Sequence, residues 1–167
     1  GNDANDDITP DLINGFTKEG FQRIVALSQR YPYYQSTLSF TTVANVHGYS
    51  TFTQTLPTVA SKTLTDMAQI ISVVNTTNAG NALIYLDEFK AESIWVGTND
   101  IAGIPVYFTI WADQVRLYPK PDQQYVINLR GYRNPNLTWF QDENTSIDID
   151  PEFQLPLTNW VMSRIFQ

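Results

Sequence analysis

The chain has 167 residues, no cysteine and a formal net charge of −7, from 17 acidic and 10 basic residues. The lack of cysteine excludes disulfides and thiolate zinc sites, and the acidic balance opposes a tight grip on nucleic-acid phosphates. Hydrophobic residues make up 43% of the chain, which is typical of a globular protein with a substantial core. No apolar run approaches the roughly 20 residues that span a membrane, so we expect no membrane partner.

Residues 1–32 are predicted to be an acidic tail followed by a helical segment. Thr9 is a candidate helix N-cap, with a proline at the first helical position. Apolar residues then recur at helical spacing. Gly15 and Gly20 weaken a helix, which favours a short helical turn followed by a better helix from Thr17.

Residues 33–135 are predicted to form a β domain. Threonine, valine and aromatic residues are abundant in 33–56. A polar connection is expected over 57–65, and the isoleucine- and valine-rich stretch 67–74 indicates a well-buried strand. A turn rich in asparagine, threonine and glycine then predicts a hairpin, with its return strand at 82–86.

A short helix and a meander complete this predicted domain. Asp87 is a candidate N-cap for a helix over 88–94. Residues 103–135 alternate between apolar and polar positions in three segments, which is the pattern of half-buried strands. Residues 112–113 and 119–122 have the composition of turns, so we predict an antiparallel meander.

Residues 136–167 are predicted to be a polar connection and a C-terminal helix. Asp150 is the expected N-cap, with Glu152 in the first turn, where the helix dipole favours a carboxylate. The expected apolar face comprises Leu155, Leu157, Trp160, Val161 and Ile165. Because the pattern stops without a cap, we expect further helical sequence beyond it.

Together these elements predict an α+β fold. We expect an antiparallel β-sandwich or barrel-like block of about seven strands, flanked by N- and C-terminal helices, with the C-terminal helical part truncated. The two flanking helices are expected to pack on each other. Such a pair leaves much apolar surface exposed, which points to missing helices or neighbouring subunits.

No constellation of residues indicates catalysis, a metal or a cofactor. His47 lies in an expected turn, and no nucleophile-elbow motif accompanies it. Asp148, Asp150 and Glu152 alternate, but a calcium loop would need a glycine at its sixth position. We therefore expect no catalytic, metal-binding or cofactor-binding residues. A glycoside hydrolase is the last alternative, because no carboxylate pair stands out.

The aromatic residues leave a second class of function open. Tyrosine and tryptophan on alternating strands are more often core and cross-strand pairs than ligand platforms. An exposed set that includes Trp111 would nevertheless suit stacking on sugars. A β-sandwich carbohydrate-binding module is therefore the alternative function.

Three segments of the β domain carry a distinctive combination of motifs: GIPVY at 103–107, VRLYPKPD at 115–122 and YVINLRGYRNP at 125–135. In this order, and followed by an acidic stretch and a terminal helix, they resemble the head-to-tail adaptor (connector, or head-completion) proteins of tailed bacteriophages. The residues of this fingerprint are Gly103, Pro105, Tyr107, Arg116, Leu117, Tyr118, Pro119, Pro121, Asp122, Tyr132 and Pro135.

The resemblance implies a structural protein of the virion. Its copies, commonly twelve, would form a ring between the portal and the tail or neck proteins and would extend the DNA channel, with DNA passing through without sequence-specific binding. It implies assembly in the cytoplasm of a bacterial host. The terminal helix, through Phe153, Trp160 and Ile165, is the candidate for portal contact.

Overall fold

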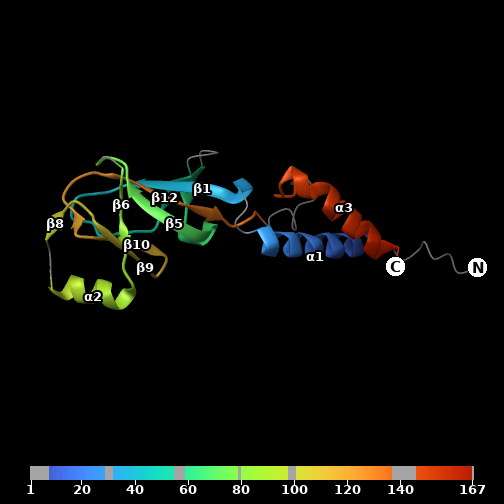
Figure 1. The fold of residues 1–167 in the computed structure, drawn as a ribbon, viewed down its shortest axis with the longest axis horizontal. Helices are drawn as coiled ribbons and strands as arrows, with labels where there is room; N and C mark the ends of the chain where they lie inside the picture. The colour runs from blue at the N-terminus through green and yellow to red at the C-terminus, as the bar shows by residue number, and fades with distance from the viewer. Residues whose placement is uncertain are drawn as a thin grey trace, which may run out of the picture. The chain divides into compact units, whose positions relative to one another are not determined.

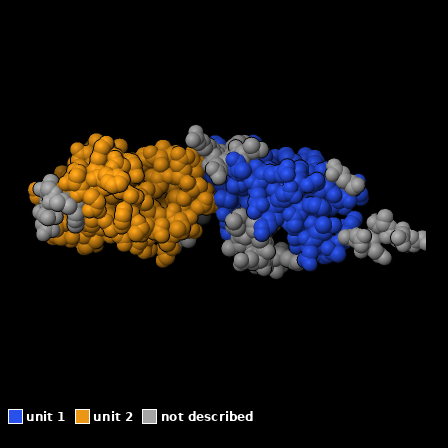
Figure 2. All heavy atoms as spheres, turned by 90° about the horizontal axis from the view of Figure 1, so that it is seen from below, with its two compact units in different colours: residues 1–34, 135–167 blue, residues 35–134 orange. Residues whose placement is uncertain are grey.

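The computed structural model describes residues 8–28, 32–54, 59–78, 80–97, 101–136 and 146–166. They form two compact units (Figure 2): unit 1 comprises residues 1–34 and 135–167, and unit 2 comprises residues 35–134. Helices make up most of unit 1 and strands most of unit 2 (Figure 1), so the predicted α+β class is confirmed.

Unit 1 contains α1 (Pro10–Ser28), the 3-10 helix η1 (Pro32–Tyr34) and α3 (Pro151–Ile165). Both predicted caps are confirmed. The backbone N–H of Leu12 donates to Thr9 Oγ1 at 3.3 Å, and that of Glu152 donates to Asp150 Oδ1 at 3.0 Å. The predicted break in the first helix is wrong, because α1 is continuous through both glycines. Packing on α3 overrides the weak local propensity.

The two helices pack on each other, as expected, around a shared apolar cluster. Its buried members are Phe21, Ile149, Leu157 and Val161, with Phe16, Ile24, Val25, Ile147, Phe153, Trp160 and Ile165 half-buried around them. Gly20 allows the close approach, since a Cβ atom there would lie 2.7 Å from Leu157 Cδ1 and Trp160 Cε3. Leu155 was expected on this face, but it is 68% exposed.

Unit 2 contains twelve strands in its described residues, where about seven were predicted. They are β1 (Gln35–Thr41), β2 (Gly48–Tyr49), β3 (Phe52–Gln54), β4 (Val59–Lys62), β5 (Met67–Asn75), β6 (Asn81–Ala82), β7 (Ile84–Tyr85), β8 (Ala102–Gly103), β9 (Tyr107–Trp111), β10 (Gln114–Tyr118), β11 (Lys120–Pro121) and β12 (Val126–Arg133). The 3-10 helix η2 (Leu64–Asp66) and α2 (Glu88–Gly97) complete the unit. Five of the strands have two residues, too few for a periodic pattern.

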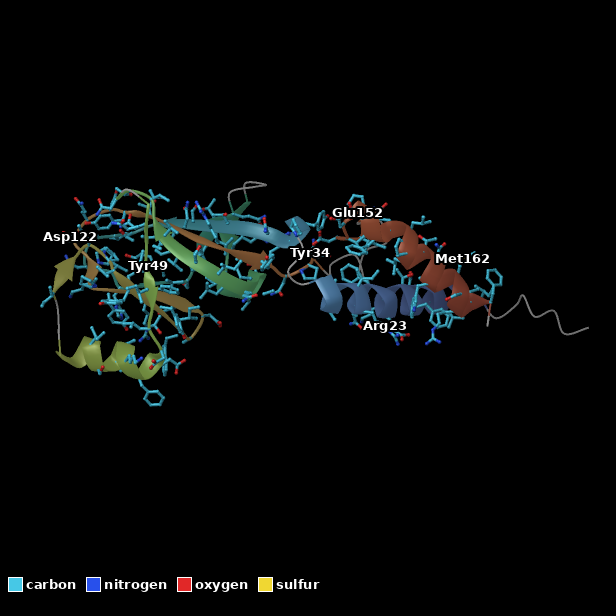
Figure 3. The ribbon with its side chains drawn as sticks, viewed as in Figure 1. Arg23, Tyr34, Tyr49, Asp122, Glu152 and Met162 are labelled. Atoms are coloured by element: carbon cyan, nitrogen blue, oxygen red, sulfur yellow. The ribbon has the colours of Figure 1, made fainter. Side chains whose placement is uncertain are left out.

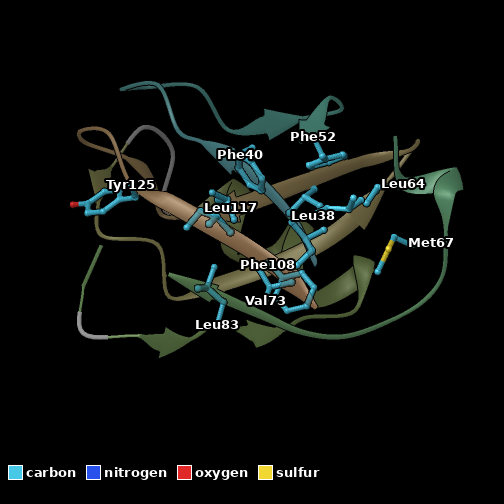
Figure 4. Close-up of a cluster of buried hydrophobic side chains, with 13 residues drawn as sticks. Leu38, Phe40, Phe52, Leu64, Met67, Val73, Leu83, Phe108, Leu117 and Tyr125 are labelled. Atoms are coloured by element: carbon cyan, nitrogen blue, oxygen red, sulfur yellow. The ribbon is translucent and has the colours of Figure 1, made fainter. Parts of the chain in front are cut away.

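The strands form two main sheets and a small third one. The larger sheet has the order β4-β3-β1-β12-β5-β6, the smaller has the order β2-β10-β9-β7, and β8 pairs with β11. Their inner faces share one core (Figure 4), which comprises Leu38, Phe40, Phe52, Leu64, Met67, Val73, Leu83, Phe108, Val115, Leu117, Tyr125, Ile127 and Leu129. Figure 1 shows α2 beside β9 and β10.

Three local predictions for unit 2 are wrong, two of them in how the strands pair. The meander ends after β9 and β10, because β12 crosses to the larger sheet and lies between β1 and β5. The return strand at 82–86 divides into β6, which pairs with β5, and β7, which pairs with β9 in parallel. The connection at 57–65 contains β4 and the start of η2. Pairing depends on partners distant in sequence, which local alternation does not specify.

The strand predicted at 67–74 is observed as β5, but it is less buried than expected. Ile71 is 60% exposed, and the pairing with β12 shifts register beside Gly131. A Cβ atom at Gly131 would collide with the carbonyl oxygen of Gln69. The absence of a side chain at this position therefore allows β5 to bulge against β12.

The two glycines of α1 give a matched test of the helix pair. Alanine improves helix propensity equally at both positions, by about 1 kcal/mol. Only Gly20→Ala places a methyl group against Leu157 and Trp160, and overpacking of this kind costs about 1–3 kcal/mol. We expect urea denaturation to show a lower free energy of unfolding for Gly20→Ala than for Gly15→Ala, by about that amount. Equal values would contradict the observed approach of α3.

Candidate assembly surfaces

Most of the fingerprint forms one corner of unit 2, where the small sheet of β8 and β11 lies. Gly103 and Pro121 are paired across this sheet. The backbone N–H of Asp122 donates to Gly103 O at 3.3 Å, and that of Val106 donates to Tyr118 O at 2.9 Å. The buried fingerprint residues are Pro105, Leu117, Tyr118 and Pro121. These residues fix the backbone where the chain leaves β10.

Asp122, labelled in Figure 3, receives a short hydrogen bond within this corner. The hydroxyl of Tyr125 donates to Asp122 Oδ1 at 2.6 Å, and this hydrogen bond raises the pKa of that phenol because it stabilises the protonated form. The backbone N–H of Tyr125 donates to Thr42 Oγ1 at 2.8 Å, and the N–H of Thr42 donates to Tyr125 O at 2.8 Å. The corner is thereby tied to the loop after β1.

Arg116 joins the smaller sheet to α2. Its Nη1 lies 3.8 Å from Glu92 Oε1, and its guanidinium lies 5.7 Å from the ring centroid of Trp111. On the neighbouring strand β9, Thr109 lies opposite Arg116. Because the guanidinium covers one face of Trp111, that face is not free to stack on a sugar. At most the other face of Trp111 could therefore stack on a sugar.

His47 packs against the same sheet as part of the structure. Its ring meets that of Tyr118 edge-on, with 5.1 Å between centroids, and its carbonyl accepts the backbone N–H of Leu117 at 2.9 Å. Burial lowers the pKa of His47, and the positive charge of the nearby Arg116 lowers it further. The contact of Nδ1 with Leu117 O, at 3.4 Å, raises the pKa and offsets only part of this effect. The ring is thus an uncharged packing group at neutral pH.

The remaining fingerprint residues are spread over other parts of the chain. Tyr107 pairs with Tyr118 across β9 and β10 and is half-buried. Tyr132, also half-buried, lies on β12 between β1 and β5, and Pro135 belongs to unit 1. The fingerprint therefore marks a scaffold and does not converge on one site.

The three α3 residues put forward for portal contact are half-buried against α1, namely Phe153, Trp160 and Ile165. The guanidinium carbons of Arg23 and Arg164 lie 5.6 and 5.5 Å from the ring centroid of Trp160. Glu19 accepts from Arg23 at 2.8 Å and lies 3.8 Å from Arg164. This network fixes how α3 lies on α1 (Figure 3 labels Arg23).

Exposed apolar side chains, which the periodicity of the sequence does not reveal, lie on both units. On α3 and directly after it they are Leu155, Met162 and Phe166; on unit 2 they include Ile71, Ile84, Tyr85 and Phe89. Phe89, on α2, is 89% exposed. No signal in the sequence separates these residues from core positions, because exposure depends on which face the neighbouring elements cover.

Unit 2 also has a groove of about 590 Å³ beside a free strand edge. Its apolar lining includes Met67 and Ile70 of β5 and Phe108 and Ile110 of β9. In the part of the chain that the structure describes, β6 pairs only with the last two residues of β5. Most of the outer edge of β5 therefore has no partner strand among the described residues, which is a feature of strands that bind other chains.

The carboxylates that a metal or hydrolytic site would need serve structural roles. Asp148 accepts the backbone N–H of Asn136 at 2.6 Å and the hydroxyl of Tyr33 at 3.2 Å, while Asp150 caps α3. Among the described residues, no group of histidine and acidic side chains could hold a metal ion. Over the same residues, no helix is both long and apolar enough to cross a membrane.

These features define the class: a scaffold with exposed apolar surfaces, typical of a structural assembly protein. A family model described as SU10 adaptor protein matches residues 1–167, so the chain belongs to the SU10 adaptor protein family. Among curated proteins none matches the chain. The resemblance to phage head-to-tail adaptors is confirmed.

Membership of this family establishes the broad role. The protein has the structural role of a phage adaptor, in a family that is generally non-enzymatic. The family implies a component of the virion neck that interacts with portal and tail proteins.

The lowered pKa of His47 makes the stability of unit 2 dependent on pH. The unfolded chain, with a histidine pKa of 6.5, binds a proton more readily than the folded chain. Stability is therefore full above pH 6.5 and falls as the pH drops below it, until the folded-state pKa is passed. Thermal unfolding from about pH 7.5 to about pH 5 should show this loss in the wild type and a smaller loss in His47→Gln. Parallel profiles would contradict it.

Proposed function

We propose that this protein is a non-enzymatic head-to-tail adaptor whose copies form a ring between the portal and the tail or neck proteins. The observation that carries the proposal is the exposed apolar surface of the helix pair, in a chain that belongs to an adaptor family. A pair of helices with apolar residues on its outside is incomplete as a monomer. Identical copies usually cover such surfaces by assembling with closed symmetry, and a ring is one form of it.

The two units suit different contacts within that ring. Unit 1 is helical and includes α3, the helix that the resemblance assigns to the portal. Phe153, Trp160 and Ile165 serve this contact by holding α3 in place on α1. Unit 2, with its groove and free β5 edge, suits contact with a tail or neck protein. The fingerprint corner fixes the point at which the chain passes from the smaller sheet of unit 2 to the larger one.

The charge distribution suits passage of DNA without binding. Unit 1 contains ten acidic and four basic residues, a net charge of −6, whereas unit 2 contains seven acidic and six basic residues, a net charge of −1. An acidic wall repels phosphates and does not retain them. We propose that DNA leaves the head through a channel extended by this ring, with no sequence-specific contact. A channel lined mainly by lysine and arginine would contradict this.

The ring can be tested with the full-length chain and the portal of the same phage. Mixing the two should produce a complex with a ring visible by electron microscopy. If the ring has twelve copies of 19.0 kDa, mass photometry should show a gain of about 230 kDa over the portal alone. A chain that stays monomeric in the presence of the portal would refute the proposed function.

A further inference from the structure

The groove of unit 2 lies where both main sheets end. On the larger sheet, β6 pairs only with Val74 and Asn75 of β5, so residues 67–72 have no partner strand on their outer side among the described residues. On the smaller sheet, β7 pairs with Tyr107 and Phe108 of β9 and, in the described chain, with no later residue of that strand. The side of the sandwich is therefore open between two strand edges, and the groove occupies this opening.

The groove opens directly onto the core of unit 2. Met67 and Phe108 line the groove and are buried in the core (Figure 4 labels both). Ile70 and Ile110 also line it, and they are half-buried and pack against the same core. Ile71, another lining residue, is 60% exposed. An apolar side chain placed in the groove would thus extend the core that the two sheets already share.

The backbone at this opening determines what kind of segment can cover it. An unpaired strand edge presents a row of N–H and C=O groups, which water solvates as long as the edge is open. A helix or a flat protein face laid over the groove would remove this water without supplying new partners, which is unfavourable. An extended segment supplies donors and acceptors at the spacing of the edge and also points alternate side chains toward the groove. The opening therefore favours a strand.

The charge of the lining indicates the composition of that strand. Of the described residues that line the groove, Asp113, in the turn between β9 and β10, is the only charged one. A lysine or arginine of the bound strand would complement this carboxylate, because interfaces place opposite charges together. The other side chains of the strand that enter the groove meet mainly isoleucine, methionine, phenylalanine and tyrosine, which favours apolar residues.

We propose that an extended segment of a tail or neck protein pairs with the free edge of β5 and fills the groove with apolar side chains, with a basic residue beside Asp113. The proposal rests on the proposed function and names how its tail contact is made. The strand comes from a different protein and not from a second copy, because Ile71 has no partner on β12 and bulges from β5. A bulge interrupts a regular edge and opposes pairing between two identical edges, whereas a strand of another sequence can be matched to it.

Hydrogen–deuterium exchange tests the pairing directly. The full-length chain is assembled on the portal of the same phage, and purified tail and neck proteins of that phage are added one at a time. We expect amide exchange in residues 67–72 to slow about tenfold or more on binding, because backbone hydrogen bonds protect amides. Residues 35–41, which form β1 inside the larger sheet, are the internal control and should not change.

Two neighbouring residues of β7 give a matched pair of variants. Tyr85 and Ile84 are both 55% exposed, but only Tyr85 lines the groove. We expect Tyr85→Glu to raise the Kd for the tail or neck protein about tenfold or more, because it places a carboxylate against an apolar segment. Ile84→Glu should bind like the wild type. Circular dichroism of the free variants checks that they fold.

A second set of variants at Asp113 tests the charge and does not disturb the core, since this residue is exposed in a turn. Asp113→Asn removes the charge and suits the same backbone, whose φ is 59°. Asp113→Lys reverses the charge. We expect the Kd to rise in the order wild type, Asp113→Asn, Asp113→Lys, because a basic residue of the bound strand first loses its partner and is then repelled. Equal Kd values would refute the basic residue of the proposed strand.

The outcomes separate this inference from the proposed function. If the wild type forms no ring with the portal, or the ring binds none of these proteins, the proposed function fails. If the ring binds a tail or neck protein while exchange in residues 67–72 is unchanged, or while Tyr85→Glu binds equally well, only the strand pairing is refuted. Slower exchange of these residues in a concentrated sample of the chain alone would assign the edge to a second copy, which also refutes it.

Discussion

The passage of the chain from one sheet to the other, between Tyr118 and Tyr125, is the constraint on which unit 2 depends. Before it, β10 pairs with β9 and β2; after it, β12 pairs with β1 and β5. The crossing is held by backbone hydrogen bonds to Gly103 and Thr42 and by the hydroxyl of Tyr125 on Asp122. If the crossing moved by one residue, Ile127 and Leu129 would turn from the core to solvent. The alternation of β12 buries its apolar side chains only in one register. The fingerprint residues at the crossing hold β12 in that register.

The sequence predicts what local chemistry determines and does not predict what pairing determines. Alternation along 125–132 places Ile127 and Leu129 inside and Val126 and Arg130 outside, as observed. The caps Thr9, Asp87 and Asp150 also act within their own turns. Local sequence does not predict which sheet β12 joins, because three consecutive alternating segments are compatible both with a meander and with a crossing to another sheet. Only the partner strands, far away in the sequence, decide between them.

The same distinction explains the helix pair. Apolar residues occupy two sides of α3, and the sequence does not indicate which side meets α1, so the apolar pattern predicts Leu155 on the same face as Leu157. The structure resolves the ambiguity through Gly20, whose missing side chain admits Leu157 and Trp160 and thereby selects the inner face. Once that face is fixed, Leu155 and Met162 must point outward. The exposure of Leu155 and Met162 is thus a consequence of how α3 packs on α1.

An adaptor protein has to be understood through the surfaces that its own folding leaves uncovered. Here the polar side chains contact the chain's own elements: Arg116 lies beside Glu92 of α2, Asp148 and Asp150 accept backbone N–H groups, and the His47 ring packs against that of Tyr118. The apolar residues that remain outside lie on both units, on elements that are otherwise well packed. Exposure of this kind lowers the solubility of a monomer and gains nothing for its stability. It becomes favourable only when another chain covers it, which is the condition that a subunit of a larger assembly fulfils.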